Sequence, residues 1–256
     1  MSEVPYQEWR SGLLGGRAVV WSRTAGAGPQ RVLPDGCTDL IWSYGDPAAP
    51  AGELFVAGPD TRAHLAEGAP GTGWVGLRFV PGTGPAVLGV PAYELKDQRV
   101  PLAALWPGAE VRRLAERLAE ETGRAGTGRN GAGRGGTGQG SAGRALEAVA
   151  LDRLRGAEPP DPAVGAVVAG LSGGRTVAEV AAEVGLGERQ LHRRSLAAFG
   201  YGPKTLARVL RLNRALDAAR AGTAFAEIAA VTGYADQAHL AREVRALTGV
   251  PLSRLL

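Results

Sequence analysis

The pattern of apolar and polar positions changes character less than halfway along this 256-residue chain. Up to residue 106, short apolar runs alternate with glycine and proline, which predicts the strands of a small β domain with turns at 34–36 and 81–82. The runs are Ala18-Val19-Val20-Trp21, Asp39-Leu40-Ile41-Trp42, Leu54-Phe55-Val56-Ala57 and Trp74 to Val80. All five tryptophans lie in the same stretch. We therefore assign residues 1–107 to a β-rich domain.

Helical spacing begins at residue 108. Val111, Leu114 and Leu118 recur every three or four positions among Arg and Glu, which predicts an amphipathic helix over 108–121 that packs on the β domain or on a second subunit. Residues 122–143 are rich in Gly, Thr and Arg and have little to bury, which predicts a flexible linker. We expect a connecting helix over 144–160 and a wholly helical domain over 161–256.

The linker also contains a glycine pattern that resembles a dinucleotide-binding fingerprint. Its members are Gly126, Gly128 and Gly131. Such a fingerprint requires a strand before it and an apolar helix after it, and the sequence predicts neither here. We interpret the pattern as low complexity.

The helical domain contains an internal repeat. Ala178-Glu179-Val180-Ala181-Ala182 recurs as Ala226-Glu227-Ile228-Ala229-Ala230, and each copy is followed at the same distance by a glycine, Gly185 or Gly233. Thr176 and Glu179 predict a capping box at the start of the first copy, and the glycine allows the positive φ of a tight turn. Each copy therefore predicts a helix-turn-helix.

The second helix of each copy is expected over 188–199 and 237–248, with Asp236 capping the latter. A long helix over 204–220, begun by Pro203, is expected to join the two copies. Arginine pairs bidentately with guanine and glutamine with adenine, so exposed side chains of these types on the second helices are candidates for base contacts. They are Arg189, Gln190 and Arg193 in the first copy and Gln237, His239 and Arg242 in the second.

Three further basic residues, Arg194, Lys204 and Arg245, are expected to bind phosphates, a contact that positions a protein without specifying sequence. A solvated helix surface with no role in binding is the competing interpretation. The distribution of charge favours DNA, because residues 1–121 carry 11 Lys and Arg against 14 Asp and Glu, while residues 161–256 carry 12 against 8. The expected partner is double-stranded DNA.

At this point the sequence resembles a known family. The stretch from Phe199 to Arg211, Phe-Gly-Tyr-Gly-Pro-Lys-Thr-Leu-Ala-Arg-Val-Leu-Arg, and the stretch from Ile228 to Leu240 are similar to the DNA-binding domain of AraC/XylS-type regulators. The resemblance covers roughly residues 162–256 and implies two recognition helices placed in successive major-groove segments, ~34 Å apart. Leu240 and Val244 depart from the phenylalanines usual in the family.

The N-terminal region resembles, less specifically, effector domains of the same family. The residues that carry this resemblance are Arg31 to Trp42, Val56 to Pro59 and Arg78 to Gly82. The resemblance implies a cupin-like β barrel or half barrel that senses a small molecule or mediates dimerisation. The predicted fold class is therefore α+β, with this small β domain followed by an all-α domain of two helix-turn-helix units.

Aromatic and polar residues of the β domain are candidates for an effector site, because such pockets are mostly apolar with a few polar anchors. The candidates are Trp21, Cys37, Asp39, Trp42, Tyr44, Trp74 and Arg78. The competing interpretation places the aromatic residues in the core of the domain. Cys37 also leaves open a redox or electrophile sensor, although Asp35 and Asp39 are expected to raise the pKa of its thiol and to disfavour the reactive thiolate.

Other classes of function find little support in the sequence. One cysteine excludes an intrachain disulfide framework, and no secretion signal or apolar stretch of membrane-spanning length is seen, so we expect a cytoplasmic protein without a membrane partner. His64, His192 and His239 lack the spacing of metal ligands, and motifs of hydrolases and nucleotide-binding enzymes are missing from the sequence. We predict no catalytic residue, no cofactor and no metal.

The function that fits these observations is a sequence-specific transcription regulator that responds to a small-molecule effector. A ligand-independent dimeric DNA-binding protein is the alternative. A homodimer and contact with RNA polymerase are left open as further partnerships.

Overall fold

The computed structural model describes residues 6–26, 28–126, 137–158 and 161–256. Its N-terminal part is built on an antiparallel sheet of six strands in the order β1-β2-β7-β4-β5-β8, beside a two-stranded ribbon of β3 and β6. The strands are β1 Gln7–Arg10, β2 Ala18–Thr24, β3 Gln30–Val32, β4 Thr38–Tyr44, β5 Glu53–Ala57, β6 His64–Ala66, β7 Gly73–Phe79 and β8 Arg99–Pro101. The sheet is open, with β1 and β8 at its edges, and so does not close into a barrel.

The four apolar runs of the sequence form the four central strands β2, β7, β4 and β5, as predicted. The short strands β1, β3, β6 and β8 were not predicted, because they are brief and largely polar. Three short helical segments, α1 Gly84–Leu88, η1 Ala92–Glu94 and η2 Leu102–Ala104, follow or interrupt the last strands.

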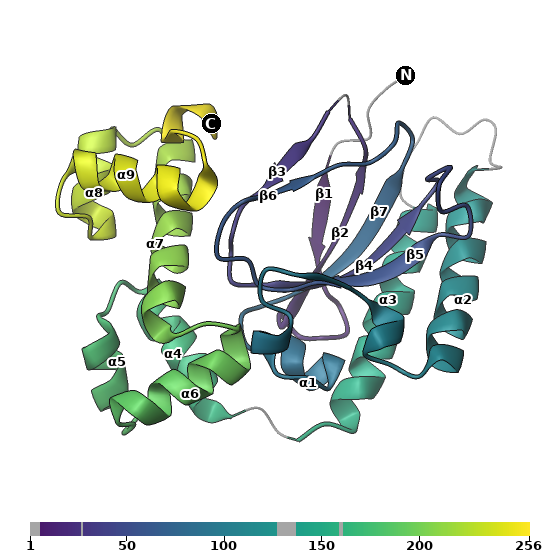
Figure 1. The fold of residues 1–256 in the computed structure, drawn as a ribbon, viewed down its shortest axis with the longest axis horizontal. Helices are drawn as coiled ribbons and strands as arrows, with labels where there is room; N and C mark the ends of the chain where they lie inside the picture. The colour runs from purple at the N-terminus through teal and green to yellow at the C-terminus, as the bar shows by residue number, and fades with distance from the viewer. Residues whose placement is uncertain (1–5, 27, 127–136, 159–160) are drawn as a thin grey trace.

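Two helices, α2 (Gly108–Gly126) and α3 (Thr137–Arg155), cover one face of the sheet, as Figure 1 shows. Because side chains alternate along a strand, one set from each strand enters the core beneath these helices. Val20, Leu40 and Leu77 are fully buried there, together with Leu118 of α2 and Leu146 of α3. The predicted amphipathic helix therefore packs on its own β domain.

The predicted linker over 122–143 is wrong at both ends. Residues up to Gly126 belong to α2 and those from Thr137 belong to α3, while 127–136, with Gly128 and Gly131, lie outside the described residues. Ala142 is fully buried, and a β-carbon on Gly143 would lie 2.6 Å from Val20 Cγ1. Small residues in α3 let the helix approach the sheet closely, a role that apolar periodicity does not reveal.

The predicted connecting helix over 144–160 is likewise part of the N-terminal domain. It is the second half of α3, and its Leu146 and Ala150 are buried in the core of the sheet. The connection to the C-terminal domain therefore falls after Arg155 and not in the glycine-rich stretch.

The C-terminal domain consists of six helices in the part of the chain that the structure describes, followed by the short segment η3 (Leu252–Arg254). They are α4 Pro162–Ser172, α5 Val177–Glu183, α6 Glu188–Phe199, α7 Pro203–Arg220, α8 Phe225–Thr232 and α9 Gln237–Thr248. One apolar cluster joins α4, α5 and α6 to the first half of α7, and a second joins α8 and α9 to its second half. The α+β class and the two helix-turn-helix units are confirmed.

Candidate DNA-binding surface and interdomain cavity

The first helix-turn-helix is α5 and α6, and its local sequence explains its shape. The Thr176 hydroxyl accepts a hydrogen bond from the Glu179 amide, and the Glu179 carboxylate accepts one from the Thr176 amide, which completes the predicted capping box. Gly185 has a φ of 65° in the turn. Leu191 and Phe199 anchor α6 in the apolar cluster, which leaves the opposite side of the helix in solvent.

The second helix-turn-helix is α8 and α9, and its Gly233 lies one residue further from the start of the recognition helix than Gly185 does. Gly233 has a φ of 82° and ends α8, and the Asp236 carboxylate accepts a hydrogen bond of 2.6 Å from the His239 amide at the start of α9. Leu240 and Val244 are buried in the second cluster.

Superposing the two 12-residue helices α6 and α9 by their helical positions pairs Arg193 with Arg242 and Gln190 with His239. Arg189, Gln190, Arg193 and Arg242 are all exposed. His239 is only half exposed: its Nδ1 accepts a hydrogen bond of 3.2 Å from the Ala235 amide, and its ring packs edge-on against Tyr234. We call α6 and α9 the recognition helices.

Gln237 and Glu188 occupy the same position, the first residue of each recognition helix. Gln237 is exposed, and so are Lys204 at the start of α7 and Arg245 near the end of α9. The three residues predicted to bind phosphates, Arg194, Lys204 and Arg245, thus lie on three different helices of the domain, α6, α7 and α9.

Arg194 is the candidate whose setting differs from its expected role. Its guanidinium forms an ion pair of 2.9 Å with Asp161, the residue that caps α4. The matching residue of α9 is Glu243, which forms an ion pair of 2.8 Å with Arg208 of α7. Residues of opposite charge thus occupy this position, and each ties its recognition helix to another part of the domain, the start of α4 or the helix α7.

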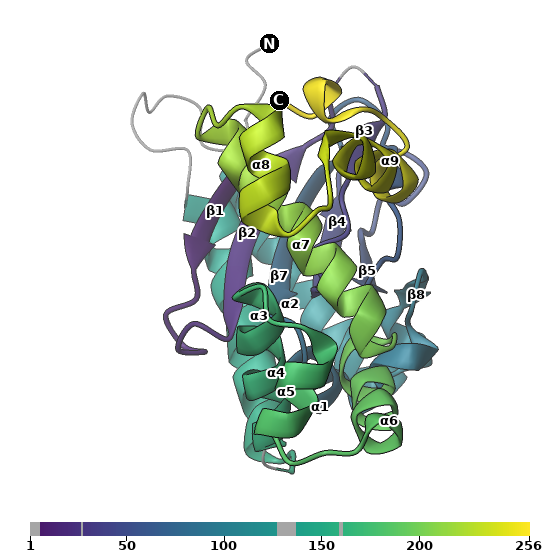
Figure 2. The same cartoon turned by 90° about the vertical axis from the view of Figure 1, so that its left-hand side faces the viewer.

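Helix α7 holds the two units at opposite ends of one rod. Arg211 donates to the Gly233 carbonyl, and Arg214 donates to the carbonyls of Ser172 and Thr232, so both satisfy the free C-terminal carbonyls of neighbouring helices. Figure 2 shows α6 and α9 on the same side of α7, one near each end, while α5 and α8 lie on the other side.

The second face of the sheet bounds a cavity of about 740 Å³ between the two domains. Neighbouring strands place Glu8, Trp21, Gly76, Ile41, Phe55 and Pro101 in one row across this face. The indole of Trp21 lies over Gly76, where a β-carbon would be 2.2 Å from the ring. Apart from Glu8, this row gives the cavity an apolar floor with two aromatic rings, Trp21 and Phe55.

A polar cluster adjoins this floor in the next row. Arg78 lies 3.2 Å from Asp39, 3.4 Å from Asp35 and 3.9 Å from Glu8, and the Trp21 Nε1 donates to Asp39 over 2.6 Å. Burial raises the pKa of Asp39, an effect that the Arg78 charge opposes. Burial also acts on Arg78, but Asp39 and Asp35 outweigh it and raise the Arg78 pKa above its ordinary value.

Of the predicted effector residues, Trp21, Asp39, Trp74 and Arg78 line this cavity. Trp42 points to the opposite face and is 1% exposed in the core, and Tyr44 lies at the edge of that core, where its hydroxyl accepts from Gln139. Both follow from the alternation along β4. Cys37 lies beside the cavity, and burial, with Asp35 and Asp39, raises the pKa of its thiol well above its ordinary value.

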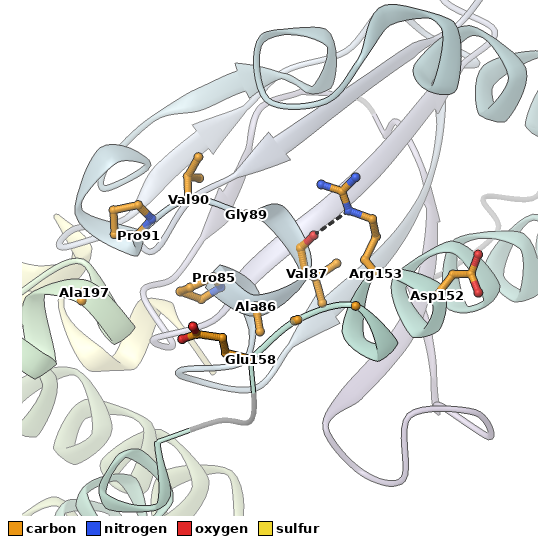
Figure 3. A pocket seen from close by; sticks show the side chains of 12 residues that line it. Pro85, Ala86, Val87, Gly89, Val90, Pro91, Asp152, Arg153, Glu158 and Ala197 are labelled. Carbon is orange, nitrogen blue, oxygen red and sulfur yellow. Dashed lines mark hydrogen bonds between the residues drawn. The ribbon is translucent and has the colours of Figure 1, made fainter.

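The cavity has a second wall that sequence reasoning missed. Asn213, Leu216 and Arg220 reach it from α7, and Arg31 and Arg99 reach it from the edges of the β domain. These residues carry no motif, and only the docking of the two domains brings them together. A further hollow of about 680 Å³ lies between α1, the end of α3 and Ala197 of α6, where Arg153 donates to the Val87 carbonyl (Figure 3).

Two further properties bear on the class of protein. Within the described residues, no group of three His, Cys, Asp or Glu side chains is arranged to hold a metal ion. None of the helices in that part of the chain has the length and apolar character needed to cross a membrane.

Comparison with known proteins agrees with the organisation of the C-terminal domain. Residues 180–256 match a family described as a helix-turn-helix domain. The C-terminal domain is therefore a helix-turn-helix DNA-binding domain. Its two helix-turn-helix units make the chain a DNA-binding transcription regulator. Residues 18–101, ahead of the helix-turn-helix domain, match a family described as a domain of unknown function (DUF6597).

No curated protein matches the chain in sequence. Among solved structures, ToxT from Vibrio cholerae O395 is 9% identical over 98% of this chain and 96% of that one, with a TM-score of 0.45. The same protein bound to (E)-4-(8-methylnaphthalen-1-yl)but-3-enoic acid is 10% identical over 98% of both chains, with a TM-score of 0.46. ToxT of strain SCE256 with a bound unsaturated fatty acid is 9% identical over 100% and 96%, with a TM-score of 0.44. Likeness at this level says nothing about what this chain binds.

Proposed function

We propose that the protein recognises two successive segments of DNA through α6 and α9, and that a small molecule in the interdomain cavity controls this recognition. The observation that carries the proposal is the composition of the cavity walls. They combine the effector candidates Trp21 and Arg78 with residues of α7, the helix that joins the two units. A ligand there touches the element on which the spacing of the recognition helices depends.

Base recognition is assigned to Arg189, Gln190 and Arg193 of α6 and to Arg242 of α9. All four are exposed on a recognition helix whose other side is anchored in an apolar cluster. His239 and Gln237 complete the set in the second unit, while Lys204 and Arg245 are assigned to phosphates. Arg194 acts through its ion pair with Asp161 to orient α6.

Selection from a pool of random duplexes tests the DNA part of the proposal. We expect two short conserved blocks, about ten base pairs from centre to centre, because the recognition helices lie on one side of α7. Arg193→Ala is expected to weaken the base preference at one position of the first block and to cost about 1–3 kcal/mol of binding free energy. Arg242→Ala is expected to do the same at one position of the second block. Arg254→Ala removes the same charge from an exposed site off the recognition helices and serves as the control. Recovery of no conserved block would contradict the proposal.

The chemistry of the cavity supports a small ligand with an aromatic part. Its volume lies within the range of small-molecule sites, ~300–1,000 Å³, and Trp21, Trp74 and Phe55 supply apolar surface. Arg23 lies 5.1 Å from the centre of the Trp74 ring and offers a positive charge near that end of the cavity. The cluster of Glu8, Asp35 and Asp39 around Arg78 offers surplus negative charge at another point.

Two probes that share a ring and differ in charge test the effector part: 3-phenylpropionate and 2-phenylethylamine. We expect one of them to raise the thermal unfolding temperature and to shift tryptophan emission, and Trp21→Phe to weaken both responses. Trp9→Phe is the matched control, since Trp9 packs on the helix-covered face of the sheet. Equal responses of the two variants would place the ligand elsewhere.

A further inference from the structure

Both recognition helices end against the β domain. Each stops at a glycine in the left-handed conformation, Gly200 with a φ of 80° after α6 and Gly249 with a φ of 77° after α9. A β-carbon on Gly200 would lie 2.8 Å from Pro59 Cγ, and one on Gly249 would lie 3.2 Å from Arg31 Nη1. The C-terminal end of each helix thus touches the β domain, and the N-terminal part remains free for DNA.

One segment of the β domain, Gly58–Ala63 between β5 and β6, reaches both helices. Its Pro59 meets Gly200 at the end of α6, and its Ala63 amide donates a hydrogen bond of 2.7 Å to the Leu247 carbonyl in the last turn of α9. From the adjacent ribbon, Arg31 Nη1 donates to the Thr248 carbonyl over 2.7 Å. Two free C-terminal carbonyls of α9 are therefore satisfied by the other domain.

The segment is held firmly inside its own domain. Asp60 accepts two hydrogen bonds from Arg99, of 2.6 and 2.9 Å, a bidentate geometry that fixes both side chains. The Thr61 amide and hydroxyl both donate to Asp97. Gly58 approaches the Leu95 carbonyl so closely that a β-carbon would lie 1.8 Å from its oxygen.

We propose that Gly58–Ala63 is a brace that positions the two recognition helices relative to each other, and that Arg31 and Asp60 are its positioning residues. The inference rests on the proposed recognition of two DNA segments. It assigns a role to the Val56-Ala57-Gly58-Pro59 motif that the proposed function leaves unexplained. The brace adds a second connection between the helices besides α7.

The brace also meets the cavity. Arg99, which holds Asp60, and Arg31, which caps α9, both line it. Leu33, two residues after Arg31 in the chain, packs against the apolar cluster of the second unit. A ligand in the cavity therefore contacts side chains at two anchoring points of the brace.

The test compares full-length variants without ligand on a series of duplexes that carry the selected blocks. The separation of the blocks is lengthened or shortened one base pair at a time. Arg31→Met and Asp60→Asn are expected to lose about tenfold in affinity at the best separation and to discriminate less between separations, because the helices are no longer held at one spacing. Their affinity for a duplex with one block is expected to stay unchanged.

Arg62→Met is the matched control, since Arg62 is an exposed arginine of the same segment with none of the described polar contacts. Arg31→Lys keeps a donor and is expected to restore much of the discrimination between separations. A variant that merely unfolds would also lose affinity for one block, which separates that effect from positioning.

The inference is overturned if Arg31→Met and Asp60→Asn show the same separation profile as Arg62→Met. It is also overturned if they bind more tightly than the unmodified protein, since the contact would then be inhibitory. Absence of a two-block site for the unmodified protein would defeat the proposed function itself, which is a distinguishable result.

Discussion

The two helix-turn-helix units repeat one backbone but stabilise it at different points. In the first unit the leading helix α5 has a full capping box, while the recognition helix α6 begins at Gly187 without a side-chain cap. In the second unit the leading helix α8 begins at Ala224 without such a cap, and the recognition helix α9 is capped by Asp236. The side chains of the recognition helices differ as well. Gln190 of α6 is exposed, whereas its counterpart His239 of α9 packs on Tyr234.

Under the proposed function, this difference suggests different roles for the two units. The first unit presents three unengaged long polar side chains on α6, as expected of the part that discriminates between base pairs. The second unit engages more of its side chains internally and is tied at its C-terminal end to the β domain through Arg31 and Ala63. It is suited to anchoring the protein and to receiving a signal from the cavity.

The largest expected effect comes from matched core residues, Leu191 of α6 and Leu240 of α9, which are 1% and 2% exposed. Replacing either by alanine is expected to lower the free energy of unfolding by about 2–5 kcal/mol, because the cavity left behind is only partly refilled. Amide hydrogen exchange should rise in α5 and α6 for Leu191→Ala and in α8 and α9 for Leu240→Ala. The same pattern of exchange in both variants would show that the two clusters unfold as one.

The capping difference can be erased in either direction. Thr176→Ala removes the box of α5 and is expected to destabilise the first unit by about 0.5–2 kcal/mol. Ala224→Thr should add a box to α8, because Ala224 has φ −65° and ψ 143°, close to the −71° and 158° of Thr176, and Glu227 stands where Glu179 does in the repeat. Urea unfolding should show opposite shifts of the midpoint for the two substitutions. A destabilised Ala224→Thr would mean that the units differ at this turn for a reason other than the missing hydroxyl.

The smallest expected effect depends on pH and concerns the ion pair of the second unit. The hydrogen bond from Arg208 lowers the pKa of Glu243 below its ordinary value of 4.5. The stability it contributes is therefore present above that pH and is lost as pH falls through the lowered pKa. Because the pair is partly exposed, the contribution is expected to stay below about 1 kcal/mol. Between pH 7 and pH 3 the thermal unfolding temperature should fall less for Glu243→Gln than for the unmodified protein. Parallel curves of unfolding temperature against pH would contradict this.

Local sequence signals were sufficient for most of the C-terminal domain. Capping residues, glycines in turns and apolar spacing act within a few residues of one another, so the bounds of α6 and α9 could be predicted to the residue. The contacts of Arg194 and His239 could not, since each depends on a partner, Asp161 or Tyr234, whose position is set by packing.

In the β domain the central strands could be predicted, whereas the sides of the sheet could not be assigned to core or cavity. Trp21 and Trp42 look alike in sequence, but the former lines the cavity and the latter is buried under the helices. The alternation of side chains along a strand tells which residues share a face of the sheet. It does not tell what covers that face. The glycine-rich stretch before residue 143 was assigned to a linker for a similar reason, since the partner that makes small residues useful, Val20, is far away in the chain.

The sequence by itself determined that this protein has two helix-turn-helix units on a common helix and a β domain ahead of them, because those features arise from short-range propensity and apolar spacing. Only the tertiary structure decided which residues form the cavity and that Gly58–Ala63 touches both recognition helices. These properties depend on contacts between segments more than a hundred residues apart, such as Arg31 with Thr248 and Pro59 with Gly200. No local pattern encodes such pairs, because each side chain would satisfy its own segment equally well with many other partners.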